Sequence, residues 1–230
     1  MSKELEKINA AKASLENVKD GMVVGIGSGS TVARLIELLG EKIKKDGLKI
    51  LTVPTSYQVQ QLLVEAKIPI TTLDEHPKLD IAIDGADEVD ENLNLIKGGG
   101  AALTQEKIVD SCTEKLIIIV DKAKMVKKLG ENFPVPLEVI PQALPLVKSR
   151  LKAITNDFEL KMAKMKLGPV ITDNGNFIIH AKIPDLWKRN LKELEKELNS
   201  IPGIIENGLF VDMTKIVYVG NEKGAEKITK

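Results

Sequence analysis

Several features that would point to a particular function are scarce or missing in this sequence. A single cysteine, Cys112, excludes an intrachain disulfide and any metal site built from several cysteines, and it fits a reducing compartment. Any bound phosphate must be held mainly by lysines, hydroxyls and backbone N–H groups, because the only arginines are Arg34, Arg150 and Arg189. The 33 basic and 33 acidic side chains cancel, which leaves no global field to attract nucleic acid or an anionic membrane.

Long apolar segments are missing as well. No run reaches the roughly 18 consecutive apolar residues of a membrane-spanning helix. Residues 1–21 are charged and periodic, without the apolar stretch of a signal peptide. We therefore expect a cytoplasmic protein. What the chain does have is 230 residues, 43% of them hydrophobic, which is sufficient for the core of one large domain or of two unequal ones.

Strand and helix patterns alternate in the first half of the chain. The apolar run 22–26 precedes a stretch in which Val32, Leu35, Ile36 and Leu39 recur at helical spacing. The same order is repeated afterwards, which predicts a largely parallel sheet covered by helices, and therefore an α/β fold. Further strands are expected at 48–54, 69–73, 79–84 and 115–121, and further helices at 101–112 and at 55–66, where Thr55 and Gln58 are spaced as a capping box.

The pattern changes after Asp121. The segment 133–141 places three prolines around an expected edge strand. Beyond it we expect helices at 145–154 and 186–201, and strands at 158–164 and 168–183 with a turn at 173–176. This order suits a small domain, so we predict a large domain at 1–130 plus 206–230 and a smaller α+β domain at 131–205. The segment 208–220 again has a strand pattern and is expected to return to the large sheet.

The first segment suited to ligand binding is GIGSGST at 25–31, between an expected strand and helix. Small residues let the backbone approach an anion, and the following helix offers free N–H groups at the positive end of its dipole. Ser30 and Thr31 add hydroxyl donors, although either could equally be an ordinary N-cap. The segment lacks the Gly-Lys pair of a P-loop and the packing positions of a dinucleotide fingerprint, so a small phosphate is the better interpretation.

The second segment is DGADEVD at 84–90, directly after an expected apolar strand. Ligands of open parallel sheets bind at the carboxyl ends of the strands, which is where Asp84 and Asp87 are expected. A solvated turn is the alternative, and it suffices for Glu88, Asp90 and Glu91. A calcium or magnesium site is a further alternative, but the acids recur at every third position rather than at the alternating positions of an EF-hand loop.

The third segment is KGGGAALTQE at 97–106. Three consecutive glycines are entropically unfavourable, which suggests that their successive N–H groups face an oxyanion or phosphate, with Lys97 supplying the charge. Glu106 follows in the first turns of the next helix, where burial against the sheet would raise its pKa toward that of a useful base. A solvated glutamate favoured by the helix dipole is the alternative.

Few other residues offer chemistry. In VDKAK at 120–124 a lysine could reach the same rim of the sheet, although a solvated lysine pair explains the segment as well. His76 precedes a proline and His180 lies in an alternating strand, so both are expected at the surface or in a turn. With one cysteine and no well-placed histidine, Cys-His and Ser-His mechanisms have no support, and carboxylate chemistry remains.

Taken together and in order, GIGSGST, DGADEVD, KGGGAALTQEK, VDKAK, FPVPLEV and VITDNGN resemble the A type of ribose 5-phosphate isomerase over nearly the whole chain. The resemblance implies a Rossmann-like large domain, a smaller α+β domain that takes part in oligomerisation, a homodimer or homotetramer, and no metal or organic cofactor. It implies that Glu106 is the proton acceptor. The substrate-binding residues that it implies are Ser28, Gly29, Ser30, Thr31, Asp84, Gly85, Ala86, Asp87, Lys97, Gly98, Gly99, Gly100 and Lys124.

The implied reaction interconverts ribose 5-phosphate and ribulose 5-phosphate in the non-oxidative pentose phosphate pathway. Glu106 would move a proton between adjacent carbons through an enediolate, a role that contributes ~10²–10⁴-fold. Lys97 and glycine N–H groups would stabilise the negative charge on the former carbonyl oxygen. Either Asp84 or Asp87 would open the furanose ring, and both would bind sugar hydroxyls. The far phosphate would be anchored by Ser30, Thr31 and Lys124.

Other functions stay open at this point. An amino-sugar phosphate deaminase or a phosphosugar lactonase could share the fold, although KGGGAALTQE argues against both. A sugar-phosphate sensor of a transcription regulator would need a DNA-binding helix pair, and residues 1–21 show none. A nicotinamide oxidoreductase would rest on the glycine loop alone.

Overall fold

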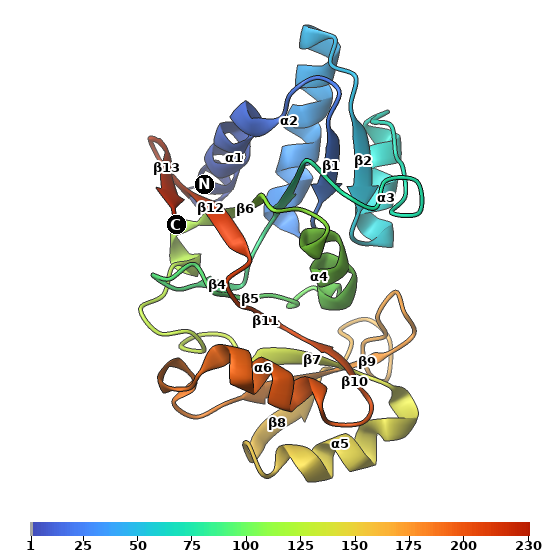
Figure 1. Ribbon diagram of the computed structural model, residues 1–230, viewed down its shortest axis with the longest axis vertical. Helices are drawn as coiled ribbons and strands as arrows, with labels where there is room; N and C mark the ends of the chain where they lie inside the picture. Colours follow the sequence, from blue (N-terminus) through green and yellow to red (C-terminus); the bar gives the residue numbers. More distant parts are fainter. Residues whose placement is uncertain (1) are drawn as a thin grey trace. The chain divides into compact units, whose positions relative to one another are not determined.

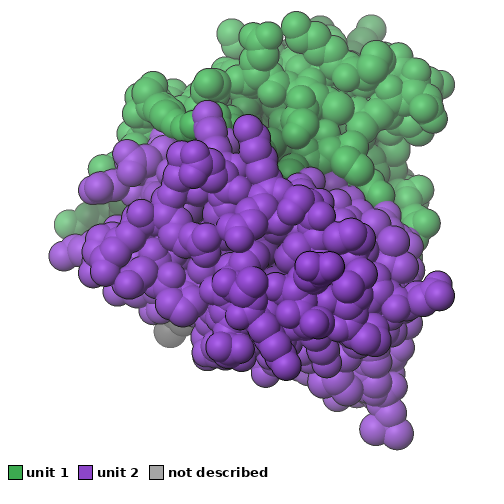
Figure 2. Space-filling model, turned by 60° about the horizontal axis from the view of Figure 1, so that its bottom comes forward, with its two compact units in different colours: residues 1–86, 105–125, 212–230 green, residues 87–104, 126–211 purple. Residues whose placement is uncertain are grey.

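A computed structural model describes residues 2–230, and the chain divides into two compact units (Figure 2). Unit 1 comprises the chain up to Ala86 together with Gln105–Met125 and Asp212–Lys230, and unit 2 comprises Asp87–Thr104 and Val126–Val211. This division differs from the predicted domains chiefly at 87–104, which the sequence pattern assigned to the large domain. The strands of that segment are two residues long, too short for a periodic pattern to reveal.

Unit 1 is built on a six-stranded sheet in the order β13-β12-β6-β3-β1-β2 (Figure 1). Neighbouring strands run parallel from β12 to β2, while β13 pairs antiparallel with β12. The predicted parallel sheet is therefore confirmed. Of the expected strand at 208–220, the part from Thr214 returns to this sheet, whereas Leu209 and Phe210 form a separate strand in unit 2. The expected strand at 69–73 is wrong, because only a bridge between Thr52 and Ile70 forms there. The strands are β1 Val23–Ile26, β2 Leu51–Pro54, β3 Ile81–Asp84, β6 Leu116–Asp121, β12 Thr214–Asn221 and β13 Gly224–Thr229.

Helices cover both faces of this sheet, because alternate residues of each strand point to opposite sides. On one face, Ile26, Ile83 and Ile119 of the strands share a core with helices α1 (Ser2–Ser14), α2 (Ser30–Asp46) and α3 (Tyr57–Glu65). On the other face, Val109 of α4 (Leu103–Ser111) packs against Val53 and Leu79. Short 3₁₀ helices in this unit are η1 Leu15–Asn17 and η2 Lys122–Lys124.

Unit 2 contains a four-stranded antiparallel sheet in the order β10-β7-β9-β8 and a small sheet in the order β11-β5-β4. Helices α5 (Leu144–Leu151) and α6 (Leu191–Asn199) pack around the apolar residues Leu137 and Ile179. This confirms the expected smaller α+β part of the fold. The remaining elements are β4 Glu88–Val89, β5 Leu95–Ile96, β7 Val135–Val139, β8 Asp157–Leu160, β9 Phe177–Lys182, β10 Ile204–Asn207, β11 Leu209–Phe210, η3 Pro141–Ala143 and η4 Leu186–Lys188.

Strand β7 is not the edge strand that its prolines predicted. It pairs with β9 on one side and with β10 on the other. Pro136 is tolerated because it lies one residue beyond the last pair with β10, which joins Leu137 to Asn207. The carbonyl of Pro136 accepts the N–H of Gly208. Proline has no N–H to donate in return, and the carbonyl of Gly208 accepts the N–H of Lys97 instead. No acceptor is left unsatisfied by the proline.

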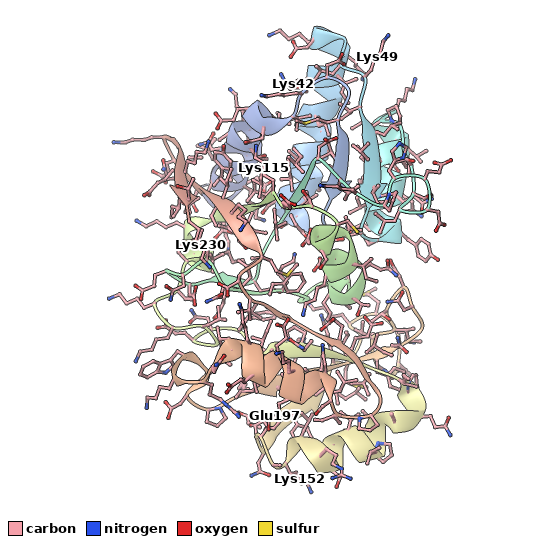
Figure 3. All side chains as sticks on the ribbon, viewed as in Figure 1. Lys42, Lys49, Lys115, Lys152, Glu197 and Lys230 are labelled. Atoms are coloured by element: carbon pink, nitrogen blue, oxygen red, sulfur yellow. The ribbon has the colours of Figure 1, made fainter. Side chains whose placement is uncertain are left out.

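Charged side chains form exposed ion pairs on the surface of each unit. Of the residues labelled in Figure 3, Lys42 lies 2.6 Å from Asp46, and Glu197 lies 3.0 Å from Arg189. Such exposed pairs contribute about 0–1 kcal/mol each, so the stability of both units rests mainly on their apolar cores. None of the helices in residues 2–230 has the length and apolar character needed to cross a membrane.

Candidate active site

The loops that follow β1, β3 and β6 leave the same edge of the sheet of unit 1, because these strands are parallel neighbours. The chain passes from β1 to β2 on one side, and then to β3 on the other side of β1. The point between β1 and β3 is therefore the place where open α/β sheets bind their ligands. Ser28 follows β1 and Asp84 ends β3, so these two predicted residues lie at this point.

Asp84 joins the two loops at the sheet edge. Its buried carboxylate accepts the N–H groups of Ser28 at 3.0 Å and of Gly85 at 2.6 Å. Gly27 is required for this arrangement, because a Cβ at that position would lie 1.8 Å from Oδ1 of Asp84. One glycine of the predicted phosphate loop therefore makes room for a carboxylate rather than for a ligand. Gly85 and Ala86, which continue the chain, are half-buried.

Hydroxyl groups from a third loop meet Ser28. Its Oγ lies 2.8 Å from the hydroxyl of Thr55 and donates to the hydroxyl of Ser56 at 2.9 Å. The predicted capping box led by Thr55 is wrong, since Ser56 caps α3 by accepting the N–H of Val59 at 3.2 Å. Sequence analysis missed both residues as site candidates, although they follow the carboxyl end of β2 and the rule applied to β1 and β3 would have found them.

Backbone donors lie where α2 begins. Gly29 is its N-cap with a φ of 108°, a conformation that favours glycine, and Ser30 and Thr31 open the helix. The first N–H groups of a helix lack intrahelical partners and lie at the positive end of its dipole. Lys124 belongs to the same sheet edge, because it ends η2 directly after β6. These groups have the donors and the charge that a phosphate requires.

Asp87 and the glycine segment belong to unit 2. The carboxylate of Asp87 accepts the N–H of Gly99 at 2.7 Å, and the ammonium of Lys161 donates to the carbonyl of Gly99. Both backbone polar groups of Gly99 are thus held by side chains. Within residues 2–230 the N–H groups of Gly98 and Gly100 have no acceptor, so these two remain available to a ligand.

Lys97 is a buried cation. Its side chain is 2% exposed, and its ammonium lies 5.2 Å from the centre of the Phe210 ring. A cation over an aromatic face is attracted by the negative potential of the ring. The position suits a lysine that interacts with a bound anion rather than with solvent.

Glu106 lies in the first turn of α4 with a side chain that is 5% exposed. The alternative of a solvated helical glutamate is therefore wrong. Close packing of α4 on the sheet explains part of this burial, since a Cβ at Gly25 of β1 would lie 2.8 Å from Cγ1 of Val109. The glycine lets the helix approach the strand.

Two acids that the sequence analysis assigned to a solvated turn are buried. Glu88 is 1% exposed and accepts the N–H groups of Gly130, Asn132 and Phe133 at 2.6, 2.5 and 2.8 Å. Asp90 is also buried and accepts the backbone N–H groups of Asn92 and Asn94. The solvated-turn interpretation is wrong for these two acids and holds for Glu91, which is exposed. Both buried carboxylates organise loops of unit 2.

The histidines differ from each other in their surroundings. His76 is half-buried in a turn, 2.9 Å from the hydroxyl of Thr71. His180, expected at the surface, packs edge-on against Phe133 at 5.8 Å, and its Nε2 is buried without a hydrogen-bond partner among the described residues. Desolvation lowers the pKa of His180. The part of the chain that the structure covers contains no group of three or more His, Cys, Asp or Glu side chains placed to hold a metal ion.

The chain is similar to known proteins along almost its whole length. The family model of ribose 5-phosphate isomerase A (phosphoriboisomerase A) matches residues 51–224. A ribose-5-phosphate isomerase A of Pyrococcus horikoshii is 50% identical over 228 residues, which are 99% of this chain and 98% of that protein. One of Methanocaldococcus jannaschii is 47% identical over 233 residues and covers 100% of both chains.

Solved structures agree with the sequence comparison. A structure of D-ribose-5-phosphate isomerase in complex with phospho-erythronic acid matches with a TM-score of 0.96 and 50% identity, covering 100% of both chains. The structure of ribose 5-phosphate isomerase A from Methanocaldococcus jannaschii has a TM-score of 0.92 and 45% identity, covering 97% of this chain and 98% of that one.

Proposed function

The chain belongs to the ribose 5-phosphate isomerase A family, and we propose that it carries out the reaction of that family with Glu106 as the catalytic base. It is an isomerase that interconverts ribose 5-phosphate and ribulose 5-phosphate, a reaction of the pentose phosphate pathway. A relative of 50% identity was solved in complex with phospho-erythronic acid, and this supports a site for a small phosphorylated sugar in its open-chain form.

The observation that carries the mechanism is the position of Glu106. The side chain is 5% exposed in the first turn of α4, and this helix follows Lys97 and the three glycines in the sequence. Interconversion of an aldose and a ketose moves one carbon-bound proton from C2 to C1 and one hydroxyl proton from O2 to O1. A single carboxylate can remove the proton from C2 of ribose 5-phosphate and return it to C1 of the resulting enediolate. Its burial limits exchange of that proton with bulk water.

Charge that develops on the former carbonyl oxygen is stabilised by donors of the glycine segment. The ammonium of Lys97 and the N–H groups of Gly98 and Gly100 are the groups suited to this role. The N–H of Gly99 is excluded from it, because it donates to Asp87. Losing one such donor typically lowers kcat by ~10²–10³.

The two aspartates bind the sugar hydroxyls, and one of them assists opening of the furanose ring. Each also holds a backbone segment: Asp84 accepts N–H groups of Ser28 and Gly85, and Asp87 accepts that of Gly99. The far phosphate is anchored at the start of α2 by Ser30 and Thr31, together with Lys124, while Ser28 and Gly29 belong to the same substrate-binding segment. Gly85 and Ala86 supply backbone groups to the substrate-binding site.

Replacing the base is the direct test. In Glu106→Gln the side chain keeps its shape and loses its basicity, so we expect kcat to fall by at least ~10²–10⁴-fold. Binding of ribose 5-phosphate, measured by calorimetry, should be retained, while formation of ribulose 5-phosphate is followed as the activity.

Glu91→Gln is the matched control, because it removes an exposed acid from the loop region of unit 2. It should retain the wild-type kcat. If Glu106→Gln turns over ribose 5-phosphate at the wild-type rate, Glu106 is not the base.

The remaining parts of this proposal are a homodimer or homotetramer, in which the smaller α+β part takes part in assembly, and a cytoplasmic location. Both are supported by the resemblance to the family. The absence of an intrachain disulfide, which the single Cys112 imposes, fits a reducing compartment. Light scattering on the purified chain measures the oligomeric state.

A further inference from the structure

The segment VITDNGN at 170–176 has no part in proton transfer or phosphate binding as proposed above. It forms a turn before β9, in which the N–H of Thr172 donates to the Asn176 carbonyl and the N–H of Gly175 donates to the Thr172 carbonyl, both at 2.9 Å. Gly175 has a φ of 80°, which favours glycine. The turn is therefore closely specified, and its polar side chains converge on a single carboxylate.

That carboxylate is Glu138, a fully buried residue of β7. Its Oε1 accepts hydrogen bonds from the Thr172 hydroxyl at 2.8 Å and from the side-chain amides of Asn174 and Asn176 at 3.0 and 2.9 Å. Its Oε2 accepts the hydroxyl of Thr104 at 2.5 Å. A buried carboxylate is tolerated only when donors satisfy it in this way, and hydrogen bonds to a charged acceptor are the stronger ones.

The two oxygens of Glu138 therefore connect two different segments. One oxygen holds the turn, and the other holds Thr104, the second residue of α4. An apolar contact acts beside the polar one, because Leu103 is buried in a cluster with Ile178, and Val170 packs against it. Two adjacent residues therefore attach the start of α4 to this region. Thr104 is linked to the VITDNGN turn through Glu138, and Leu103 packs in the cluster that contains Ile178 and Val170.

We propose that Glu138 is a positioning residue for the isomerisation, which fixes the start of α4 and thereby the orientation of Glu106. Thr104 and Glu106 lie in the first turn of one helix, so a displacement of Thr104 is passed to Glu106 along its backbone. A catalytic group that is misplaced by about 1 Å can lose ~10²-fold in rate. The inference rests on the proposed role of Glu106. Glu138 itself touches no reacting atom in this role.

Two threonine variants separate positioning from stability. Thr104→Val removes the hydrogen bond to Oε2 and detaches α4 from the carboxylate. Thr172→Val removes one of the bonds to Oε1 and also the bond that the Thr172 hydroxyl accepts from the N–H of Asn176 at 3.1 Å. The second variant therefore loses at least as much hydrogen bonding but leaves the link to α4 in place.

We expect Thr104→Val to lower kcat by about 10- to 100-fold with KM changed less than about twofold, because the groups that hold the phosphate are untouched. Thr172→Val should show an equal or larger fall in melting temperature and a kcat close to that of the wild type. Thr104→Ser, which retains the hydroxyl, should restore kcat. Activities are compared well below the melting temperature of every variant.

Equal losses of kcat in Thr104→Val and Thr172→Val would overturn the positioning role and leave Glu138 as a purely structural residue. A wild-type kcat in Thr104→Val would also overturn it. The Glu106→Gln measurement decides the base separately. An inactive Glu106→Gln combined with a fully active Thr104→Val would refute the positioning role alone, whereas an active Glu106→Gln would refute the proposed base itself.

Discussion

Glu88 and Glu138 are buried acids that connect segments of unit 2 through their hydrogen bonds. Glu88 accepts three backbone N–H groups of the loop at 130–133, and Glu138 accepts four side-chain donors. Burying a carboxylate is favourable only if enough donors reach it. Removing either carboxylate would leave several donors unsatisfied, so substitution of either residue is expected to be destabilising.

His180 contributes to the pH dependence of the free energy of unfolding, and the burial of its side chain sets the sign of this contribution. Desolvation first, and then the positive charge of Lys161, lower the pKa of His180, and the carboxylates of Glu159 and Asp87 oppose this in part. As the pH falls below about 6.5 the unfolded chain takes up the proton before the folded one. The contribution is therefore fully present above that pH and is lost progressively below it.

We expect His180→Leu to lose less stability than the wild type between about pH 7.5 and about pH 5.5, since leucine does not titrate. Urea denaturation at both pH values gives the free energies of unfolding. The carboxylates that titrate at lower pH are common to both proteins and cancel in the difference. Parallel losses in the two proteins would show that His180 has no such role.

At the scale of secondary structure, α4 is the element on which the proposed chemistry depends. Its first two residues, Leu103 and Thr104, belong to unit 2, and the rest of the helix belongs to unit 1. Glu138 holds its start, and the packing of Val109 holds its body against the sheet. The close approach of helix and sheet needs a strand position without a side chain, which Gly25 provides.

Gly25→Ala should therefore be destabilising. The added Cβ would lie 2.8 Å from Cγ1 of Val109 and 3.0 Å from Cβ of Ala82, which forces the helix away from β1. We expect a loss of about 1–3 kcal/mol in the free energy of unfolding, together with a lower kcat because α4 carries Glu106. Urea denaturation and the isomerase assay measure the two effects.

Gly40→Ala in α2 is the matched control for this change. Its Cβ would lie 3.6 Å from the nearest atom, an ordinary contact, and alanine is the better helix former. This variant should gain about 0.4–1 kcal/mol and keep its activity. A Gly25→Ala protein as stable as Gly40→Ala would contradict the tight packing of α4.

At the scale of the whole molecule, each unit is assembled from separate parts of the chain. The core of unit 2 combines Ile96 and Leu209 with Leu137 and Ile179, and β5 pairs with β11. The predicted small domain at 131–205 contains neither β5 nor β11. Residues 87–104 and 206–211 therefore contribute to the core and the strand pairing of unit 2.

A fragment test follows from this composition. We expect residues 131–205 alone to unfold without a cooperative transition, because the fragment lacks Glu206 and Asn207 of β10, which pair with β7, and the core residues Ile96 and Leu209. A chain that joins 87–104 to 126–211 through a flexible linker should unfold cooperatively. Circular dichroism during urea titration compares the two, and a cooperative transition in the shorter fragment would favour the predicted domain boundaries instead.

Local patterns in the sequence were sufficient to identify the family, the alternation of strands and helices, and the segments that lie at the ends of β1, β3 and β6. These features depend on local periodicity and on short motifs such as KGGGAALTQE, which are written within a few neighbouring residues. Three features became visible only in the folded chain: Glu88 and Glu138 are buried, β7 lies inside its sheet, and 87–104 belongs to unit 2. Thr104 is 34 residues from Glu138, and Phe133 is 45 residues from Glu88, so no local pattern records that these donors meet these acids.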